Sequence, residues 1–170
     1  MPISVRSPRS FSGLAPALRA LVRAALRSEG RRAGDVGVLL ADDATLRRLN
    51  RSWRGLDRAT DVLSFEYGEA PAGPAAPRRA TYTLIHGDLA ISIDRVREQA
   101  RRFRVTPGEE LARLVVHGAL HLAGLDHRHA AERREMRRRE QRALRSGAAA
   151  VRELSKRLSR AAVSGRIGAR

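Results

Sequence analysis

Three histidines in an otherwise apolar stretch, HGALHLAGLDH (residues 117–127), restrict how this chain can fold. His117 and His121 are four residues apart, so a helix would place them one turn apart on one face, with ring nitrogens able to converge on one ion. Gly124 is a natural left-handed stop after the last helical turn. The chain reversal there could bring His127 to a third ligand position and leave a fourth position open to water or substrate.

The residues before this stretch indicate where the helix begins. Thr106 offers a capping hydroxyl, Pro107 suits the first helical position, and Glu109 stands three residues after the cap. The helix is therefore predicted from about Pro107. The histidines could form a metal site or be scattered core residues, and the triad with its spaced glycine favours a metal. His86 and His129 have no partners at ligand spacing, so we expect a strand or surface side chain at each.

The spacing His-x-x-x-His-x-x-Gly-x-x-His also occurs in metzincin proteases, in which a glutamate directly after the first histidine is the general base. In this chain that position is Gly118. The ligand spacing of a zinc hydrolase is thus present without the peptidase base, which argues against proteolysis by the usual route. Because the chain has no cysteine, a tight metal site must use histidine with carboxylate or water.

The composition indicates a globular protein with a basic surface. A length of 170 residues with 42% hydrophobic residues suits one domain. Arg19 and Arg23 interrupt the best N-terminal apolar segment, so neither a membrane span nor a secretory signal is expected, and we predict a cytoplasmic protein. The acid-poor opening segment also resembles an organellar transit peptide, but we expect it to be folded.

The excess of basic residues is large. Lys and Arg number 34 against 18 Asp and Glu, which gives a formal net charge of +16 and favours nucleic acid as a partner. Lys156 is the single lysine, so the abundance of arginine could also reflect the nucleotide composition of the genome. A merely solvated basic surface is the alternative.

Apolar periodicity and capping residues predict short strands early in the chain and helices late. The predicted strands are Ile3–Val5, Asp35–Ala41, Asp61–Tyr67 and Tyr82–Ile93, the last with a bulge at Gly87. The predicted helices are Leu14–Leu26, one capped by Asp42 or Asp43 that ends near Asn50, one capped by Asp94 that ends near Phe103, the histidine helix, and Ala130–Leu144. Residues 68–80 should form a flexible loop. Helices flanking a small mixed sheet give an α/β (α+β) fold in layers.

We expect one domain over residues 1–145 and a basic C-terminal extension over residues 146–170. The extension carries Val151, Leu154 and Leu158 at helical spacing. It could therefore be a basic amphipathic helix that contacts RNA, or a frayed and dispensable tail.

Three stretches, in order along the chain, together resemble one known family. They are LNRSWRGLDRATDVLSF (residues 49–65), GDLAIS (87–92) and VHGALHLAGLDH (116–127), with Met136 and Glu140 downstream. The chain resembles the YbeY family of bacterial rRNA-maturation metalloendoribonucleases, which also has glycine at the position of Gly118. Trp53 stands where tyrosine is common in that family, and Ala59 where proline is frequent.

The resemblance implies one zinc ion held by His117, His121 and His127, with His117 and His121 also counted as catalytic residues. It further implies a functional arginine at Arg54, whose guanidinium would bind the phosphate by two hydrogen bonds and stabilise the charge of the transition state.

The group that handles protons is not assigned by the sequence. Asp126 lies next to a ligand and is expected to orient a histidine rather than to act as a base. Asp88 could do the same or cap a turn, and packing and capping are the plainer roles for Asp61 and Ser64.

The implied function is a zinc-dependent, single-strand-specific endoribonuclease that acts on the 3′ end of small-subunit rRNA in ribosome maturation or quality control. Single-stranded RNA, rRNA and the small ribosomal subunit are the expected partners, with no membrane. The alternatives are a non-catalytic RNA- or ribosome-binding factor that contains zinc, and a metzincin-like hydrolase of another substrate. With only six aromatic residues, the protein is expected to read little RNA sequence.

Overall fold

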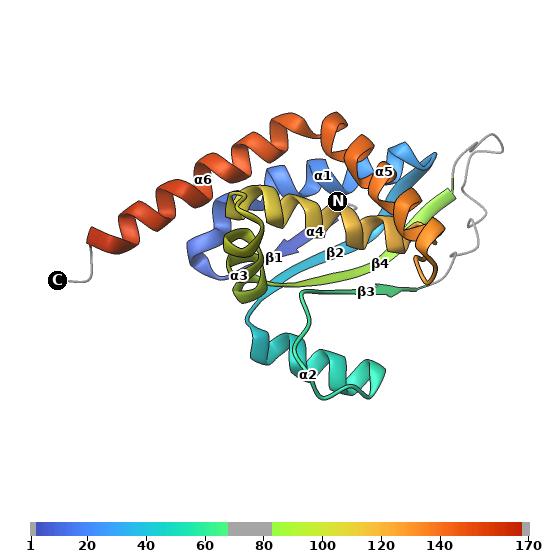
Figure 1. Ribbon diagram of the computed structural model, residues 1–170, viewed down its shortest axis with the longest axis horizontal. Helices are drawn as coiled ribbons and strands as arrows, with labels where there is room; N and C mark the ends of the chain where they lie inside the picture. Colours follow the sequence, from blue (N-terminus) through green and yellow to red (C-terminus); the bar gives the residue numbers. More distant parts are fainter. Residues whose placement is uncertain (1–2, 68–82, 168–170) are drawn as a thin grey trace.

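A four-stranded mixed sheet lies between helix α2 (Asp43–Arg54) and the other helices (Figure 1). The computed structural model describes residues 3–67 and 83–167. The strand order is β1-β2-β4-β3, with β1, β2 and β4 parallel and β3 antiparallel to β4. The strands are β1 (Ile3–Arg6), β2 (Arg31–Ala41), β3 (Val62–Glu66) and β4 (Thr83–Ser92). The predicted α+β class, with helices flanking a small mixed sheet, is confirmed.

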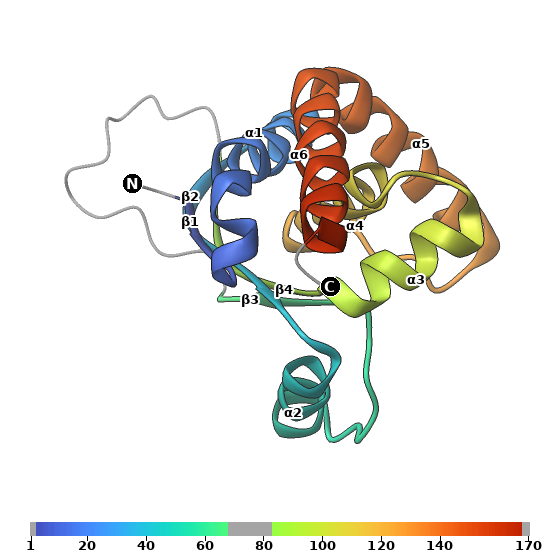
Figure 2. The same cartoon turned by 90° about the vertical axis from the view of Figure 1, so that its left-hand side faces the viewer.

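The helices lie on both sides of this sheet, most of them above it in Figure 1. They are the 3₁₀-helix η1 (Arg9–Leu14), α1 (Ala15–Ser28), α2 (Asp43–Arg54), α3 (Ile93–Phe103), α4 (Pro107–Leu122), α5 (Ala130–Ser146) and α6 (Ala148–Ile167). Helix α2 lies on the opposite side of the sheet from α4 (Figures 1 and 2). Within residues 3–67 and 83–167, no helix is both long and apolar enough to cross a membrane.

Helix α4 begins as the sequence predicts. Thr106 accepts a hydrogen bond from the Glu109 backbone N–H, and the Glu109 side chain accepts one from the Thr106 backbone, which completes a capping box. Pro107 occupies the first turn, where its missing N–H costs nothing. The helix is apolar on most of its surface and packs against α1, α3, α5, α6, β3 and β4. It is therefore a central element of the core.

Two predicted helix boundaries were wrong. Helix α2 continues past Asn50 to Arg54, because the Asn50 side chain turns inward to donate to the Arg58 carbonyl and the helix stops only at Gly55, with φ of 69°. Helix α3 is capped by Ser92, which accepts from the Arg95 N–H at 3.1 Å, and not by Asp94. The hydroxyl at the end of β4 reaches the first turn and makes a cap two residues later unnecessary.

The bulge predicted at Gly87 lies in β2 instead. The register between β2 and β4 shifts between Ala33 and Val36, so that Gly34 and Asp35 together face His86 of β4. The His86 ring accepts a hydrogen bond from the Asp35 N–H at 3.0 Å, which satisfies a donor that the bulge removes from the ladder. Tyr82 and the predicted loop over residues 68–80 lie outside the described residues.

The C-terminal segment is helical where the structure describes it. Leu154 is fully buried and Leu158 nearly so, and both belong to the main core. Thr106 and Ser155 share a hydrogen bond between their hydroxyls at 2.9 Å, and a Cβ atom at Gly108 would lie 2.2 Å from the Ser155 backbone nitrogen. Helices α4 and α6 are thus in backbone contact. The division of the chain at residue 145 stays a prediction.

Candidate metal centre

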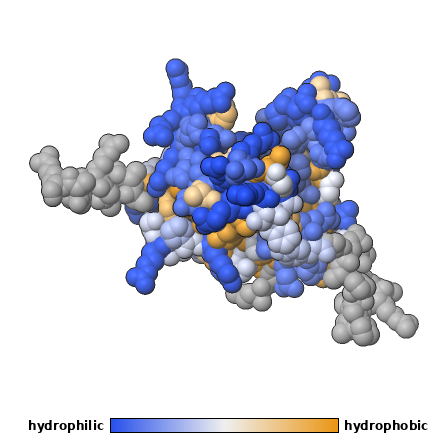
Figure 3. Space-filling model, turned by 90° about the horizontal axis from the view of Figure 1, so that it is seen from below, coloured by the Kyte–Doolittle hydropathy of each residue, from blue (hydrophilic) through white to orange (hydrophobic). Residues whose placement is uncertain are grey.

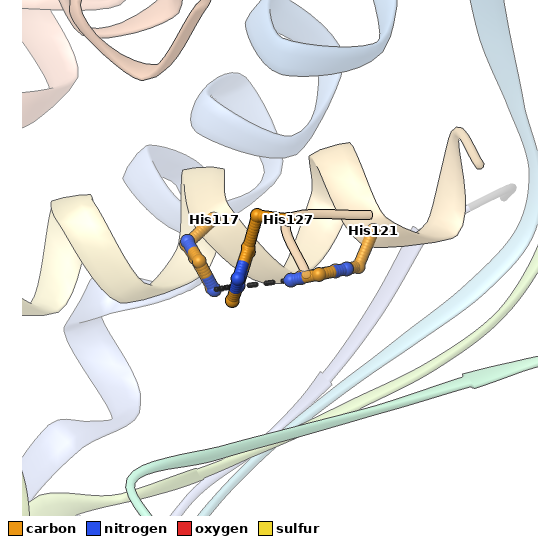
Figure 4. A group of neighbouring side chains, drawn as sticks. All are labelled: His117, His121 and His127. Carbon is orange, nitrogen blue, oxygen red and sulfur yellow. Dashed lines mark hydrogen bonds between the residues drawn. The ribbon is translucent and has the colours of Figure 1, made fainter. Parts of the chain in front are cut away.

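The structure brings His117, His121 and His127 together (Figure 4). His117 and His121 project from the same face of α4, and His127 reaches them from the loop that follows. The Nε2 atom of His117 lies 3.1 Å from Nε2 of His121 and 3.4 Å from Nε2 of His127. All three rings are half-buried. The convergence expected from the spacing is therefore present.

The turn after α4 positions the third histidine. Gly124 has φ of 91°, a backbone conformation that L side chains rarely adopt, and its N–H donates to the His121 carbonyl. Asp126 accepts from the His127 backbone N–H and from the Arg128 side chain, each at 2.7 Å, and the first of these hydrogen bonds lowers the pKa of Asp126 most. Asp126 was expected to orient a histidine ring. It holds the backbone of the loop instead.

Glu140 of α5 fixes the orientation of the first ligand. Its carboxylate is nearly buried and lies 2.5 Å from Nδ1 of His117. A carboxylate at that distance accepts a hydrogen bond from Nδ1–H, so the proton stays on Nδ1 and the Nε2 lone pair of His117 faces the other two rings. Three ring nitrogens directed at one point need a cation or shared protons between them. The structure thus presents a carboxylate–histidine pair of the kind that supports bound metals.

The donor set fits a zinc ion. Zinc–nitrogen bonds of about 2.0–2.1 Å in a tetrahedron give edges of roughly 3.3–3.4 Å between ligand nitrogens. The two Nε2 separations from His117, 3.1 Å and 3.4 Å, are close to that edge. Burial lowers the pKa of His121, and the neighbouring rings of His117 and His127 lower it further, which favours the neutral imidazole that a metal requires.

Gly118 has a packing role. A Cβ atom there would lie 2.9 Å from Cδ2 of Leu89 on β4 and 3.1 Å from Cγ2 of Val62 on β3. Gly118, which stands where metzincin proteases have their catalytic glutamate, thus lets α4 lie close against the sheet. A larger residue at that position would force the side chains of Leu89 and Val62 to shift.

The other acidic and hydroxyl candidates are not part of the histidine cluster. Asp88 accepts a short hydrogen bond from the Tyr67 hydroxyl. The Asp61 side chain accepts hydrogen bonds from the Val62 N–H and from the Gln99 side chain. It lies directly before β3, in agreement with the expected capping role. Ser64 is half-buried on β3. None of the three side chains contacts a histidine of the cluster in the described part of the chain.

Arg54 lies apart from the histidines. It is the last residue of α2, it is exposed, and α2 is on the far side of the sheet from α4 (Figure 2). Among the described residues, it forms no hydrogen bond or ion pair with another side chain. Seen from below, the α2 side of the molecule is mostly hydrophilic, with small hydrophobic areas between charged side chains (Figure 3). The guanidinium is therefore free to meet a ligand.

Sequence reasoning gave no role to Glu140. It is separated from His117 by 23 residues and a second helix, so no spacing rule connects the two. One signal was available in the sequence: Met136 and Glu140 are four residues apart, which places them on one face of a helix. The structure shows that both are buried, so this face of α5 packs inward. A buried carboxylate on that face needs a partner, and a histidine is a suitable one.

Comparison with known proteins identifies relatives over most of the chain. A family model described as Endoribonuclease YbeY matches residues 10–147. A protein named Endoribonuclease YbeY from Anaeromyxobacter sp. (strain Fw109-5) is 42% identical over 139 residues, which are 81% of this chain and 67% of that protein. One of the same name from Roseiflexus sp. (strain RS-1) is 47% identical over 113 residues, 66% of this chain and 69% of that protein.

A solved structure has the same fold. The solution structure of a Thermotoga maritima protein aligns with a TM-score of 0.54 at 26% sequence identity. The alignment covers 89% of this chain and 92% of that one. The overall fold of this chain is therefore shared with a protein whose structure was determined by experiment.

Replacing Glu140 by glutamine should weaken metal binding about 10- to 100-fold, because an amide neither carries the charge that strengthens the His117 ligand nor fixes its tautomer. Competition with a chromophoric zinc chelator measures the affinity. Glu135→Gln is the control, since Glu135 lies on the same helix and pairs with Arg139. Equal zinc affinity for the two variants would contradict the role of Glu140.

Replacing Gly124 by alanine should weaken metal binding by up to about tenfold, since an L residue in a left-handed conformation costs roughly 1–2 kcal/mol and the strained loop carries His127. Gly30→Ala is a matched control. Both glycines have positive φ, 91° and 66°, and a Cβ atom at either would meet nothing within 4 Å. Both variants should lose stability in urea unfolding, but only Gly124→Ala should lose zinc affinity. A loss of zinc affinity in both would show a general effect of strain.

Proposed function

Because this chain belongs to the endoribonuclease YbeY family, it is an enzyme that cleaves RNA, and we propose that its activity depends on one zinc ion held by His117, His121 and His127. One observation carries this proposal. The Nε2 atoms of His121 and His127 both lie at about a tetrahedral edge from Nε2 of His117, and the His117 ring is held by a buried carboxylate.

A zinc ion bound there would supply a Lewis acid, able to lower the pKa of a coordinated water and to polarise a phosphodiester. The protein's own residues do the rest. His117, His121 and His127 would hold the ion through neutral imidazoles, Glu140 keeps the Nδ1 proton of His117 in place, and α4 keeps the first two rings rigid. The loop fixed by Asp126 sets the position of His127.

Arg54 is the proposed phosphate-binding residue. A guanidinium can donate two parallel hydrogen bonds to a phosphate and stabilise charge that develops during cleavage. Its exposure, and its lack of a partner in the described part of the chain, support this role. The structure does not bring Arg54 beside the histidines, since α2 and α4 lie on opposite sides of the sheet, so the support is chemical and comes from the family resemblance around residues 49–65.

The proposed substrate is single-stranded RNA, in particular the 3′ end of small-subunit rRNA, and the proposed setting is ribosome maturation or quality control in the cytoplasm. The net charge of +16 supports a polyanionic substrate. Phosphate contacts alone give affinity without sequence preference. The specificity for the cleavage site would then come from the small ribosomal subunit, which is the proposed partner.

The two alternatives gain no support from the site. A structural zinc site normally closes its fourth position with a protein ligand, and within the described residues the metal-ligand group contains the three histidines only. A metzincin-like hydrolase needs a glutamate at the position that Gly118 occupies, and Gly118 packs against Leu89 and Val62 of the sheet.

The His117→Ala variant should lose cleavage of a labelled single-stranded fragment from the 3′ end of small-subunit rRNA, and a chelator should abolish cleavage by the unaltered protein. His129→Ala is the control, because His129 is exposed at the start of α5 and outside the cluster. Added zinc should restore the chelated protein but not His117→Ala. Cleavage by His117→Ala at the rate of the unaltered protein would contradict the proposal.

The Arg54→Lys variant should lower kcat about 10²-fold without changing zinc affinity, because lysine keeps the charge but cannot donate the paired hydrogen bonds. Arg51→Lys, one turn earlier on α2 and also exposed, is the matched control. Single-turnover cleavage and zinc competition on the same preparations separate the two effects. An unchanged kcat for Arg54→Lys would remove Arg54 from the mechanism.

A further inference from the structure

A groove adjoins the metal centre between the end of α3, α4 and α5. Its volume is about 460 Å³, and it reaches the side chains of His117 and His127. Apolar groups in its lining come from Phe103, Val105 and Met136. An apolar surface directly beside two metal ligands is suited to hold part of a substrate.

Phe103 is the aromatic group of this groove. Its side chain is 52% exposed, and that of Val105 is 39% exposed, although both are large and apolar. Helix α3 ends with Arg104 in the left-handed conformation, and the Val105 N–H donates to the Ala100 carbonyl at 3.0 Å. This turn brings two apolar side chains, on either side of Arg104, into the lining of one groove.

The same groove is basic. Arg133 and Arg137 are four residues apart, on the same face of α5, and both line it. Arg133 donates to the Arg128 carbonyl at 3.1 Å, and Arg113 is neutralised by Glu110. Arg137 is exposed and has no carboxylate partner among the described residues. Its positive charge is thus available to an anionic ligand.

We propose that this groove binds one unpaired nucleotide of the RNA substrate, with the base against Phe103 and the adjoining phosphate at Arg137. The inference rests on the proposed function and names the part of the substrate that the chain itself recognises. An aromatic ring beside an uncompensated guanidinium is complementary to a base joined to a phosphate. A base inside a duplex is stacked on both sides and cannot use such a platform.

This assignment agrees with the expectation that the protein reads little RNA sequence. The chain has only six aromatic residues, and the fold places one of them in the groove that His117 and His127 line. A ring can stack on any base, so the groove selects unpaired RNA and reads little sequence. The selection of single strands is then a property of this chain.

The test measures binding of a single-stranded 2′-O-methyl oligoribonucleotide that contains 2-aminopurine, with the full-length zinc-loaded protein. The 2′-O-methyl groups slow cleavage, and 2-aminopurine loses fluorescence when it stacks on a ring. Phe103→Ala and Phe103→Leu should weaken binding about fivefold or more and abolish the quenching, whereas Phe103→Tyr should retain both. Leu84→Ala is the control, since Leu84 is 46% exposed and outside the groove.

The phosphate contact has its own readout. Arg137→Ala should reduce the slope of log affinity against log salt by about 0.7, the value for one phosphate of a single strand. Arg142→Ala, exposed on the same helix and outside the groove, should leave the slope unchanged. Equal slopes for the two variants would overturn the assignment of Arg137.

The outcomes separate this inference from the proposed function when cleavage of ordinary RNA is followed in parallel. Zinc-dependent cleavage with unaltered binding by Phe103→Ala would overturn the groove assignment alone. Unaltered binding by Phe103→Leu would also overturn it, because the groove would then accept apolar groups in general, as for a protein partner. Loss of binding and quenching in Phe103→Ala, with no cleavage by any protein, would support the groove and contradict the proposed function.

Discussion

The burial of α4 is the constraint on which the rest of the structure depends. The helix packs against four other helices and two strands, and Gly118 lets it approach β3 and β4 closely. Because its backbone cannot move without disturbing the core, two histidines one turn apart keep a fixed separation. The candidate metal centre therefore lies at the surface of a core helix, and the packing that holds this helix also keeps the two histidines in place.

A second helix completes the centre from outside. Glu140 of α5 reaches His117, while Met136, one turn earlier, is buried in the core. The same helix presents Arg133 and Arg137 to the groove beside the histidines. Helix α5 thus provides the buried carboxylate that orients His117 and the positive charges that line the groove. It connects the orientation of the metal ligands with the place where RNA is proposed to bind.

Local signals predicted the features that depend on neighbouring residues. The capping box at Thr106, the stop at Gly124 and the histidine triad follow from spacing along one helix and one turn, and the structure contains all of them. Contacts between distant segments were not predictable. The carboxylate of Glu140, the bulge beside His86 and the place of Phe103 in the groove arise only when separate elements pack, and no sequence period encodes that packing.

The most direct test of the account is a crystal structure of the zinc-loaded protein with anomalous diffraction measured at the zinc edge. The account predicts one ion bound to Nε2 of His117, His121 and His127 at about 2.0–2.1 Å, with Glu140 hydrogen-bonded to Nδ1 of His117 and no fourth ligand from the protein. An ion bound elsewhere, or one whose fourth ligand is a side chain of this chain, would contradict it.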